Sequence, residues 1–477
     1  MAHYDLLIRN ARVLDAETKF DDISDVAITN GVIERVAPEI DRAKANDSID
    51  ASGQWVMPGM IDTHVHVANA SDFGELRGAG LPMVAAAGAT TVIDLGGSMD
   101  VLVAGIAARG SGVNVGSLGY LKPGETVPEG RLSTDVITEI VGTALESGSI
   151  GIKLWGGYYP FTPEETSDLI ATANRMAAYV AYHVGTTATG SRLDGVREIP
   201  ELLGSTGRLH IAHVNAYCRG SVLPIEDEIR EALQILEDLR EQVVSESHLA
   251  SMNFTKGKCD EDGNVLADVV SNCLKLRNYD PSYEGIRAAL RDGYASAVEE
   301  TRTGLVLVTG ERGVELFDAA QTDISMSFPV NSPVSGFHLT SARNSRNEFT
   351  VDAIASDGGA LPRNVNLEQA FRLVKFGAFE PLDLVAKLSL NPAKMMGLSS
   401  KGRLSEGNDA DLTVIDPEIG NASHTIVGGD LVMMAGRVIG TGGKILTTDR
   451  GEKAVAATGI DYELLDLTQA MMYAGRG

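Results

Sequence analysis

From Gly53 onward, short apolar runs alternate with stretches that are long enough to form helices. This alternation is typical of repeated β/α units that build a parallel sheet. Eight runs are candidate strands, at residues 60–66, 90–95, 113–120, 150–155, 180–183, 209–214, 243–246 and 352–356. Helical stretches lie between most of them, for example at residues 162–178 and 225–241. Eight strands with intervening helices predict an α/β fold of the (β/α)8 TIM-barrel type.

Both ends of the chain carry a different, antiparallel β pattern. Short apolar runs flank the turn Asn30-Gly31, and further runs lie at residues 410–415 and 426–439. We therefore expect a small β-sandwich domain built from residues 1–56 and 400–450. The barrel, residues 57–399, is inserted into it, and residues 451–477 form a C-terminal tail. The long interval from Asn253 to Phe349 predicts extra loops or helices, a candidate lid over the site.

The charge and cysteine content exclude several classes of protein. The net charge is −25, from 40 basic and 65 acidic residues, so a nucleic acid or an anionic membrane surface would be repelled. The three cysteines, Cys218, Cys259 and Cys273, do not suggest a disulfide framework, which favours a reducing compartment. Neither a signal peptide nor an apolar run of about 18 residues is apparent, so we expect a cytoplasmic protein.

The first predicted barrel strand ends in two histidines. His64 and His66 are two residues apart, so their side chains share one face of the strand. The C-terminal ends of barrel strands are where barrel enzymes place their chemistry. Two imidazoles on one face are a chelating pair for a metal such as zinc, although a pair of surface histidines is the alternative.

The segment that contains these histidines also resembles a known family. Pro58-Gly59-Met60-Ile61-Asp62-Thr63-His64-Val65-His66 is similar to the first-strand signature of the amidohydrolase superfamily, which includes hydantoinases, dihydroorotases and N-acyl-D-amino acid deacylases. Residues 390–394 and 402–412 resemble that family's exit from the barrel. The resemblance spans residues 4 to 440, is weakest at 253–349, and implies a metal-dependent hydrolase that cleaves a C–N amide bond.

Lys153 lies within the apolar fourth strand, where an ammonium group is costly to bury. A lysine whose head reaches water is the alternative. In hydantoinase-like members of the family a carbamylated lysine at the fourth strand bridges two metals. The resemblance therefore implies that a carbamate derived from CO2 forms on Lys153.

The resemblance also implies the remaining metal ligands. His183 and His213 end the fifth and sixth strands, like the two histidines that hold the second metal, and Asp357 follows the eighth strand. The complete binuclear set comprises His64, His66, Lys153, His183, His213 and Asp357. These ligands suit zinc, manganese and cobalt, and we expect two divalent ions, with zinc as the first candidate. His210 should face away from His213, so we predict that it is structural.

Roles in the reaction follow from this set. Two metals lower the pKa of a bridging water and polarise the carbonyl, so that a metal-bridged hydroxide attacks while Asp357 acts as general base and then as acid. Tyr158 stands five residues after Lys153, where hydantoinases carry a tyrosine that donates to the developing oxyanion. Arg192 and Arg363 are candidates to bind a substrate carboxylate, or else surface arginines.

The substrate stays open between two small-molecule classes. Lys153 with Tyr158, and residues 244–247, resemble hydantoinases and favour a cyclic amide or imide of the hydantoin or dihydropyrimidine type. Residues 113–119 and 183–213 resemble N-acyl-D-amino acid deacylases and leave a linear amide or dipeptide as the alternative, although Ser117 stands where those enzymes commonly carry a cysteine ligand. A mononuclear deaminase and a non-enzymatic hydantoinase-like scaffold are further alternatives, disfavoured by the filled ligand set. The family resemblance implies a homodimer or homotetramer.

Overall fold

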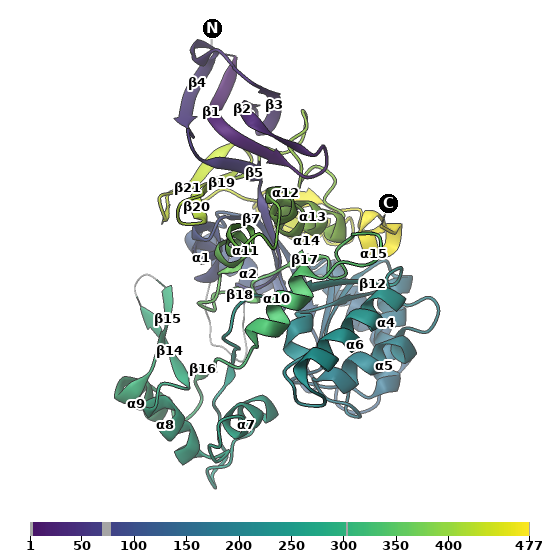
Figure 1. Cartoon of the computed structure of the whole chain (residues 1–477). Coiled ribbons are helices and arrows are strands. Elements are labelled where there is room, and N and C mark those ends of the chain that lie inside the picture. Colours follow the sequence, from purple (N-terminus) through teal and green to yellow (C-terminus); the bar gives the residue numbers. More distant parts are fainter. Residues whose placement is uncertain (1–2, 69–77, 302–303, 477) are drawn as a thin grey trace.

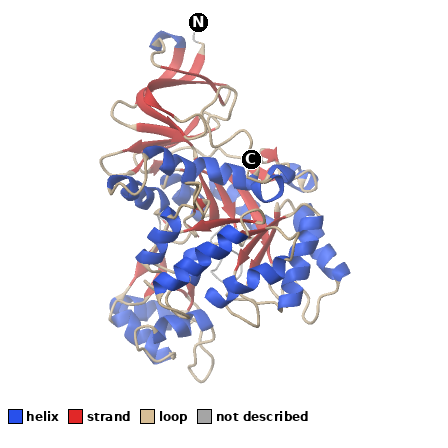
Figure 2. Ribbon diagram, turned by 45° about the vertical axis from the view of Figure 1, so that its right-hand side comes forward, coloured by secondary structure: helices blue, strands red, loops and turns tan. Residues whose placement is uncertain are grey.

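Parallel strands surrounded by helices form the centre of the molecule (Figures 1 and 2). The computed structural model describes residues 3–68, 78–301 and 304–476. The strand order is β17-β12-β11-β10-β9-β8-β7-β6-β18, and neighbouring strands run parallel. The barrel strands are β6 (Met60–His66), β7 (Ala89–Asp94), β8 (Asn114–Tyr120), β9 (Gly151–Trp155), β10 (Tyr179–His183), β11 (Leu209–Ile211), β12 (Val243–Ser247), β17 (Ala353–Ile354) and β18 (Gly358–Gly359). The predicted α/β barrel is confirmed.

Two short strands, β17 and β18, share the eighth strand position. One pairs with β12 and the other with β6, so together they connect the two edges of the parallel sheet. β17 pairs with β12, with Ala353 opposite Glu246, and β18 pairs with β6, with Gly358 opposite Val65. The chain leaves the sheet for three residues between β17 and β18. Asp357 lies in this gap, which places its side chain at the edge of the barrel next to β6.

Helices connect the strands on the outside of the barrel (Figure 2). They are α1 (Gly80–Ala86), α2 (Met99–Arg109), α3 (Thr134–Glu146), α4 (Pro163–Arg175), α5 (Leu193–Leu203), α6 (Ile225–Asp238), α10 (Pro333–Ser341), α11 (Asn366–Lys375), α12 (Pro381–Val385) and α13 (Asn391–Met396). The start of α4 shows how the local sequence sets a boundary. Thr162 accepts from the backbone N–H of Glu165, the Glu165 carboxylate accepts in return from Thr162, and Pro163 fits the first helical position.

The two ends of the chain form one mixed sheet at the top of Figure 1. Its strands are β1 (Tyr4–Asp15), β2 (Phe20–Thr29), β3 (Val32–Ala37), β4 (Ala45–Asp50), β5 (Trp55–Pro58), β19 (Leu412–Asp416), β20 (Asn421–Val427), β21 (Asp430–Met434) and β22 (Arg437–Val438). β5 pairs with both β1 and β19, which joins the N-terminal and C-terminal strands. The Asn30-Gly31 turn between β2 and β3 is confirmed, with φ of 52° and 77° at its two residues.

The long interval between β12 and β17 folds as a separate lobe, at the lower left of Figure 1. Its antiparallel sheet has the order β13-β16-β14-β15. The lobe contains β13 (Thr255–Lys256), α7 (Asp268–Lys275), α8 (Tyr283–Arg291), β14 (Ser296–Thr301), β15 (Gly304–Val308), α9 (Gly310–Ala319) and β16 (Ser325–Ser327). It has its own core, in which Ile286, Phe317 and Phe328 are buried. The predicted extra structure is therefore present, and its role as a lid stays a prediction.

The C-terminal segment lies on the barrel. β23 (Ile445–Thr447), within the range predicted for the small β domain, pairs in parallel with β8, and β24 (Tyr462–Leu464) pairs with β23. The segment also contains α14 (Glu452–Ala456) and α15 (Met471–Ala474). Within the residues that the structure describes, no helix combines the length and apolar character that a membrane crossing requires.

Candidate metal centre

The C-terminal ends of the barrel strands bring the predicted ligands together. In β9, Ile152 and Leu154 pack among the residues beneath the outer helices, so Lys153 between them faces the barrel interior. His64 lies near the end of β6, and His183 is the last residue of β10. Residues far apart in the sequence thus converge at one end of the barrel.

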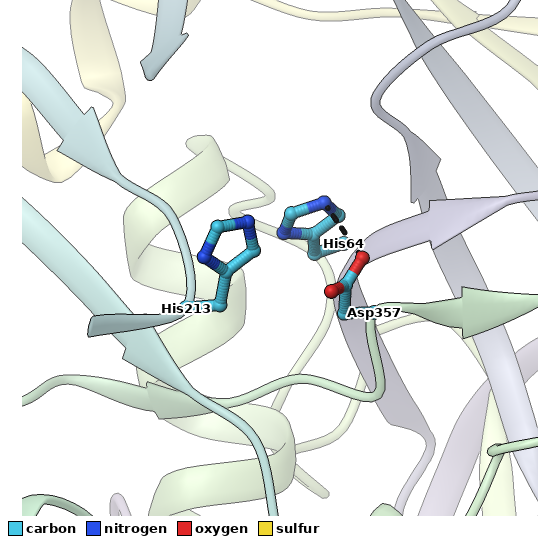
Figure 3. A group of neighbouring side chains, drawn as sticks. All are labelled: His64, His213 and Asp357. Carbon is cyan, nitrogen blue, oxygen red and sulfur yellow. Dashed lines mark ion pairs between the residues drawn. The ribbon is translucent and has the colours of Figure 1, made fainter. Parts of the chain in front are cut away.

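Three side chains form the tightest group. His64, His213 and Asp357 each offer one ligand atom, and these atoms lie within 4.8 Å of one another. Figure 3 shows the three side chains around a common space, with the ion pair between His64 and Asp357 drawn as a dashed line. Nε2 of His64 is 3.3 Å from Oδ1 of Asp357. All three residues are buried, which suits a metal held away from bulk water.

His66 and His183 extend this group. Nε2 of His66 is 3.2 Å from Oδ1 of Asp357, and the buried Nδ1 of His66 has no hydrogen-bond partner among the described residues. The ring centroid of His183 is 4.5 Å from that of His213. Nε2 of His183 also contacts Oγ of Ser191 at 2.8 Å. The structure therefore brings all four predicted ligand histidines together.

His213 lies just beyond its strand. The sixth strand, predicted at residues 209–214, ends at Ile211 in the structure. The chain then continues to a 3-10 turn, η2 (Val214–Tyr217). His213 adopts the left-handed conformation, with φ of 35°. Its backbone N–H is 3.3 Å from Oε1 of Glu246, and its Nδ1 is a second buried nitrogen without a partner in the described part of the chain. An unpaired ring nitrogen in the cluster is consistent with a metal ligand.

Lys153 is a buried lysine on the interior face of β9. Its side chain is 1% exposed, and within the described residues its Nζ has no hydrogen-bond partner. Burial lowers the pKa of Lys153 to about 8, against the opposing charges of Glu246 and Asp357. A neutral amine is the form that reacts with CO2. The resulting carbamate anion could bind metal ions, whereas the unmodified amine has no hydrogen-bond partner among the described residues. The residues present therefore fit a carbamate with bound divalent ions.

The environment also keeps the histidines in the form that binds metals. Burial lowers the pKa of His64 to about 4, with the charge of Lys153 acting in the same direction. Burial likewise holds the pKa values of His183 and His213 well below the ordinary value for imidazole. Neutral imidazole is the species that coordinates a metal, so these rings are ready to bind at neutral pH.

Asp357 is held by a neighbouring arginine. Burial by itself would raise the pKa of Asp357, but the charges of Arg363 and His64 hold that pKa well below its usual range. Nη2 of Arg363 lies 2.6 Å from Oδ2 of Asp357, and Nε of Arg363 donates to the Asp357 carbonyl oxygen. Asp357 has a φ of 50°, a strained conformation for a residue with a side chain. Arg363, a candidate to bind a substrate carboxylate, is therefore paired with Asp357 in this structure, and its role toward a substrate stays a prediction.

Glu246 is a buried carboxylate beside the cluster that no sequence motif singles out. Its buried carboxylate contacts Nδ1 of His64, accepts from Oγ1 of Thr63 at 2.6 Å and lies 3.1 Å from Nε2 of His210. A carboxylate on the far nitrogen of a ligand histidine fixes the ring's orientation and tautomer. His210, predicted to be structural, contacts Glu246. The only indication in the sequence is that Glu246 is a charged residue at the end of the predicted strand 243–246.

Of the other predicted catalytic and substrate-binding residues, Tyr158 lies near the histidine cluster and Arg192 does not. The Tyr158 hydroxyl donates to the Phe254 carbonyl oxygen at 2.8 Å, and the Tyr158 ring centroid is 5.5 Å from that of His183. Arg192 is not brought to the cluster. Its side chain is 54% exposed, and its Nε pairs with Asp194 at 2.9 Å at the start of α5.

Two further residues near the cluster were missed by the sequence analysis. His248 is buried beside Asn215, and its ring centroid is 6.4 Å from that of His213. Arg219 follows η2, and both its Nε and its Nη2 donate to Oδ1 of Asn331. No local pattern marks either residue, because their neighbours are supplied by distant parts of the chain.

Known proteins match this chain in sequence and fold. The model of the amidohydrolase family matches residues 285–439. A dihydroorotase of Anaeromyxobacter sp. (strain K) is 26% identical, with 91% of this chain and 98% of that protein covered. A dihydroorotase of Geobacter metallireducens is 25% identical, with 87% of this chain and 90% of that protein covered.

Solved structures share the fold. The N-acyl-D-glutamate deacylase of Bordetella bronchiseptica, solved with zinc and a phosphonate inhibitor, superposes with a TM-score of 0.67 at 15% identity and covers 93% of this chain and 99% of its own. A D-hydantoinase superposes with a TM-score of 0.60 at 16% identity and covers 92% and 98%. The family match, the relatives and the buried histidine–carboxylate cluster agree, so the chain resembles the metal-dependent amidohydrolases, hydrolases that act on carbon–nitrogen bonds, in sequence and in fold.

Proposed function

We propose that the protein hydrolyses the C–N bond of a cyclic amide or imide, of the hydantoin or dihydropyrimidine type, with two divalent metal ions bound at the barrel end. The observation that carries this proposal is Lys153, a buried amine without a hydrogen-bond partner in the described chain, whose charge acts on His64 and His183. A carbamate on Lys153 would supply two oxygens where two metal ions need a bridge.

Each ligand has a place in this arrangement. His64 and His66 would hold one ion and His183 and His213 the other, while Lys153 and Asp357 would contribute oxygen ligands. Zinc is the first candidate for both ions. When bound, the ions would lower the pKa of a water molecule and polarise the carbonyl oxygen of the amide.

Asp357 would move the proton. Its low pKa means that the carboxylate is ionised at neutral pH. Oδ2 is paired with Arg363, whereas Oδ1 faces His64 and His66. We assign Oδ1 to take the proton of the attacking water and to pass it to the leaving nitrogen. Arg363 keeps the carboxylate oriented during both transfers.

Tyr158 would stabilise the oxyanion. Burial raises the pKa of the Tyr158 hydroxyl, so the group stays protonated and can donate. Its hydrogen bond now goes to the Phe254 carbonyl oxygen, where the inserted lobe begins. A bound substrate would take this hydrogen bond over, and the donor would then strengthen as charge develops on the carbonyl oxygen.

Metal analysis and a substrate panel test the proposal. We expect two metal ions per chain, and hydrolysis of a hydantoin or a dihydropyrimidine that a chelator abolishes and added zinc restores. One ion per chain would contradict the binuclear assignment and favour a mononuclear deaminase. If only N-acyl amino acids are hydrolysed, the cyclic substrate class is wrong and the linear one is right.

Substitution of Lys153 tests the bridging role. Lys153→Ala should bind less metal and lose activity, and short-chain carboxylates should restore part of it by supplying the missing oxygens. Lys387→Met is the matched control, because Lys387 is also fully buried but bonds to the Val351 carbonyl oxygen away from the cluster. Full activity of Lys153→Ala would refute the bridging role.

A linear N-acyl amino acid is the second candidate. It is favoured by the guanidinium groups of Arg219 and Arg363, which are linked through Asn331 and the Met252 carbonyl oxygen and could attract a substrate carboxylate. Hydantoins and unsubstituted dihydropyrimidines lack such a group. The same panel distinguishes the two classes.

A further inference from the structure

A cavity of about 780 Å³ lies where the mixed sheet of the two chain ends meets the barrel. Its walls come from the end of α1, the start of α11 and the strands β20 and β21, which lie next to these helices (Figure 1). Small side chains leave the space open, since Ala86 and Ala87 stand at the end of α1, Ala422 lies on β20 and Ala435 follows β21. The six predicted metal ligands, all in the described chain, are absent from the walls, so this junction cavity is separate from the metal centre.

The rim of the junction cavity exposes large apolar side chains. Ile419 is 63% exposed and Met434 is 46% exposed, and both line the cavity together with the buried Leu367 of α11. Apolar side chains that gather in water around a concavity of this size are typical of ligand-binding sites. The junction cavity can therefore hold the apolar body of a small molecule.

The charged side chains of the junction cavity are acidic. Asp416 and Glu368 line it, and among the residues that the structure describes neither a lysine nor an arginine does. Glu368 is already paired with Arg372. Asp416 is partly buried and accepts from the Glu418 backbone N–H through Oδ1 at 2.9 Å, but in the described chain no cation lies within ion-pair distance of it. The Asp416 carboxylate is therefore available to a cation on a ligand.

Neutral hydrogen-bonding groups complete the walls. Nδ1 of His424 lies 3.0 Å from Oγ of Ser423, and the same Oγ lies 3.0 Å from Oε1 of Gln54. Burial lowers the pKa of His424, so its ring is uncharged at neutral pH and does not repel a cation. An ammonium group would thus meet a carboxylate and neutral oxygens in this cavity, whereas an anion would be repelled by Asp416 and Glu368.

Asn364 connects the junction cavity to the strand that follows Asp357. Its side chain lines the cavity and also holds Gly359, because Oδ1 accepts from the Gly359 N–H at 2.6 Å and Nδ2 donates to the Gly359 carbonyl oxygen at 2.8 Å. Gly359 belongs to β18, which begins directly after Asp357 and pairs with β6 opposite His66. A ligand beside Asn364 would therefore act on the segment that positions two predicted metal ligands.

We propose that the junction cavity is a second binding site, for a small molecule that joins an ammonium group to an apolar body, and that its occupation alters metal binding through Asn364. Asp416 anchors the ammonium group, while Leu367, Ile419 and Met434 contact the apolar body. The site does not depend on which amide is hydrolysed, so it goes beyond the proposed function and can fail separately from it.

Two probes of one shape test the charge preference by calorimetry on the zinc-loaded protein. Tryptamine is cationic and tryptophol is neutral, and neither has an amide to cleave. We expect tryptamine to bind with a Kd below about 1 mM and tryptophol to bind about 10-fold more weakly. Asp416→Asn should weaken tryptamine binding by about 10-fold and leave tryptophol binding unchanged, because asparagine can still accept from the Glu418 N–H.

Two further variants place the probe in the junction cavity. Asp430→Asn, at an exposed carboxylate of β21 outside the cavity, is the matched control and should bind tryptamine like the wild type. Asn421→Trp, at an exposed position of β20 on the cavity wall, should fill the space and abolish tryptamine binding. Tryptamine binding that Asp416→Asn leaves unchanged would locate the probe elsewhere and overturn the proposal, as would the absence of binding to the wild type.

Competition with a chromogenic chelator measures the link to the metal centre. Saturating tryptamine should change the zinc affinity of the wild type by about 5-fold or more, and bound zinc should change the tryptamine affinity by the same factor. Asn421→Trp should show no such response, which excludes chelation of zinc by the probe. An unchanged zinc affinity in the saturated wild type would overturn the role of Asn364. None of these measurements requires turnover, so failure of the proposed function would appear only in the substrate panel.

Discussion

Gly157 lies so close to His183 that its lack of a side chain decides where the ring can lie. A Cβ atom at Gly157 would overlap Nε2 and Cε1 of His183. We expect Gly157→Ala to displace this ligand and to lower the metal content from two ions to one per chain, with a matching loss of activity. Gly442→Ala is the control, because a Cβ there meets nothing within 4 Å. Metal analysis after gel filtration is the measurement, and two retained ions would show that the ring does not need this space.

Glu246 contacts Nδ1 of His64 and would act on a bound metal through that ring. Replacing it with glutamine keeps the shape of the side chain but removes the charge that fixes the tautomer of His64. We expect Glu246→Gln to weaken metal binding by about 10- to 100-fold, as for other partners of ligand histidines. Competition with a chromogenic chelator measures this directly. Glu198→Gln, at a carboxylate that accepts hydrogen bonds from two threonines instead, should bind metal like the wild type.

Residues of the site that belong to a local sequence pattern could be predicted, whereas residues placed only by contacts with distant parts of the chain could not. His64 and His66 could be predicted, because strand periodicity alone places them on one face. Arg219 could not be predicted, because its partner Asn331 is 112 residues away, between the inserted lobe and α10. Arg192 was a candidate only because it follows a strand, and helix α5 then directs it to solvent.

At the scale of elements, a π-helical turn (Ala386–Leu390) between α12 and α13 buries Lys387. Its Nζ donates to the Val351 carbonyl oxygen at 2.5 Å, and burial lowers the pKa of Lys387 to about 7. At pH values between about 7 and the ordinary pKa of a lysine, Lys387 is neutral in the folded protein but protonated in the unfolded chain. The free energy of unfolding should therefore rise with pH above 7, by at most about 1.4 kcal/mol per pH unit from this group.

Urea unfolding of wild type and Lys387→Met at several pH values isolates this contribution. The difference in unfolding free energy between the two proteins should grow from pH 7 to 10 in favour of the wild type. Other buried groups, Lys153 among them, titrate in both proteins and cancel. A difference that does not change with pH would mean that Lys387 stays charged in the folded protein.

Strand positions were easier to predict than strand ends. All eight barrel positions follow from apolar runs, but β11 stops at Ile211 and the eighth position splits into β17 and β18. Both departures lie at predicted ligands, His213 and Asp357, and both residues have positive φ. Local patterns favour regular strands there, whereas the site requires side chains aimed at a common centre.

At the scale of the whole molecule, the C-terminus holds the barrel at the end opposite the metal centre. Arg476 pairs with the buried Asp352 at the start of the eighth strand position and donates to the Val243 carbonyl oxygen at 2.8 Å. Arg476→Ala leaves that carboxylate with fewer partners and should lower the free energy of unfolding by about 2 kcal/mol. Arg450→Ala, which removes a more exposed ion pair with Glu146, should cost less.

Urea unfolding followed by circular dichroism measures both variants, and metal analysis should show unchanged occupancy. A loss of metal in Arg476→Ala would show that the two ends of the barrel are coupled. The sequence predicts only a tail for residues 451–477, because no local pattern in them indicates contacts with the barrel.

The inserted lobe leaves and rejoins the barrel at nearly one point. The Asn253 backbone N–H donates to the Phe328 carbonyl oxygen at 2.9 Å, and Oδ1 of the Asn253 side chain accepts from the Phe328 backbone N–H at 2.8 Å. The lobe between them has its own core and sheet. Such a segment can be lengthened, shortened or exchanged during evolution without shifting the catalytic strands, so substrate range and barrel chemistry can diversify independently on this scaffold.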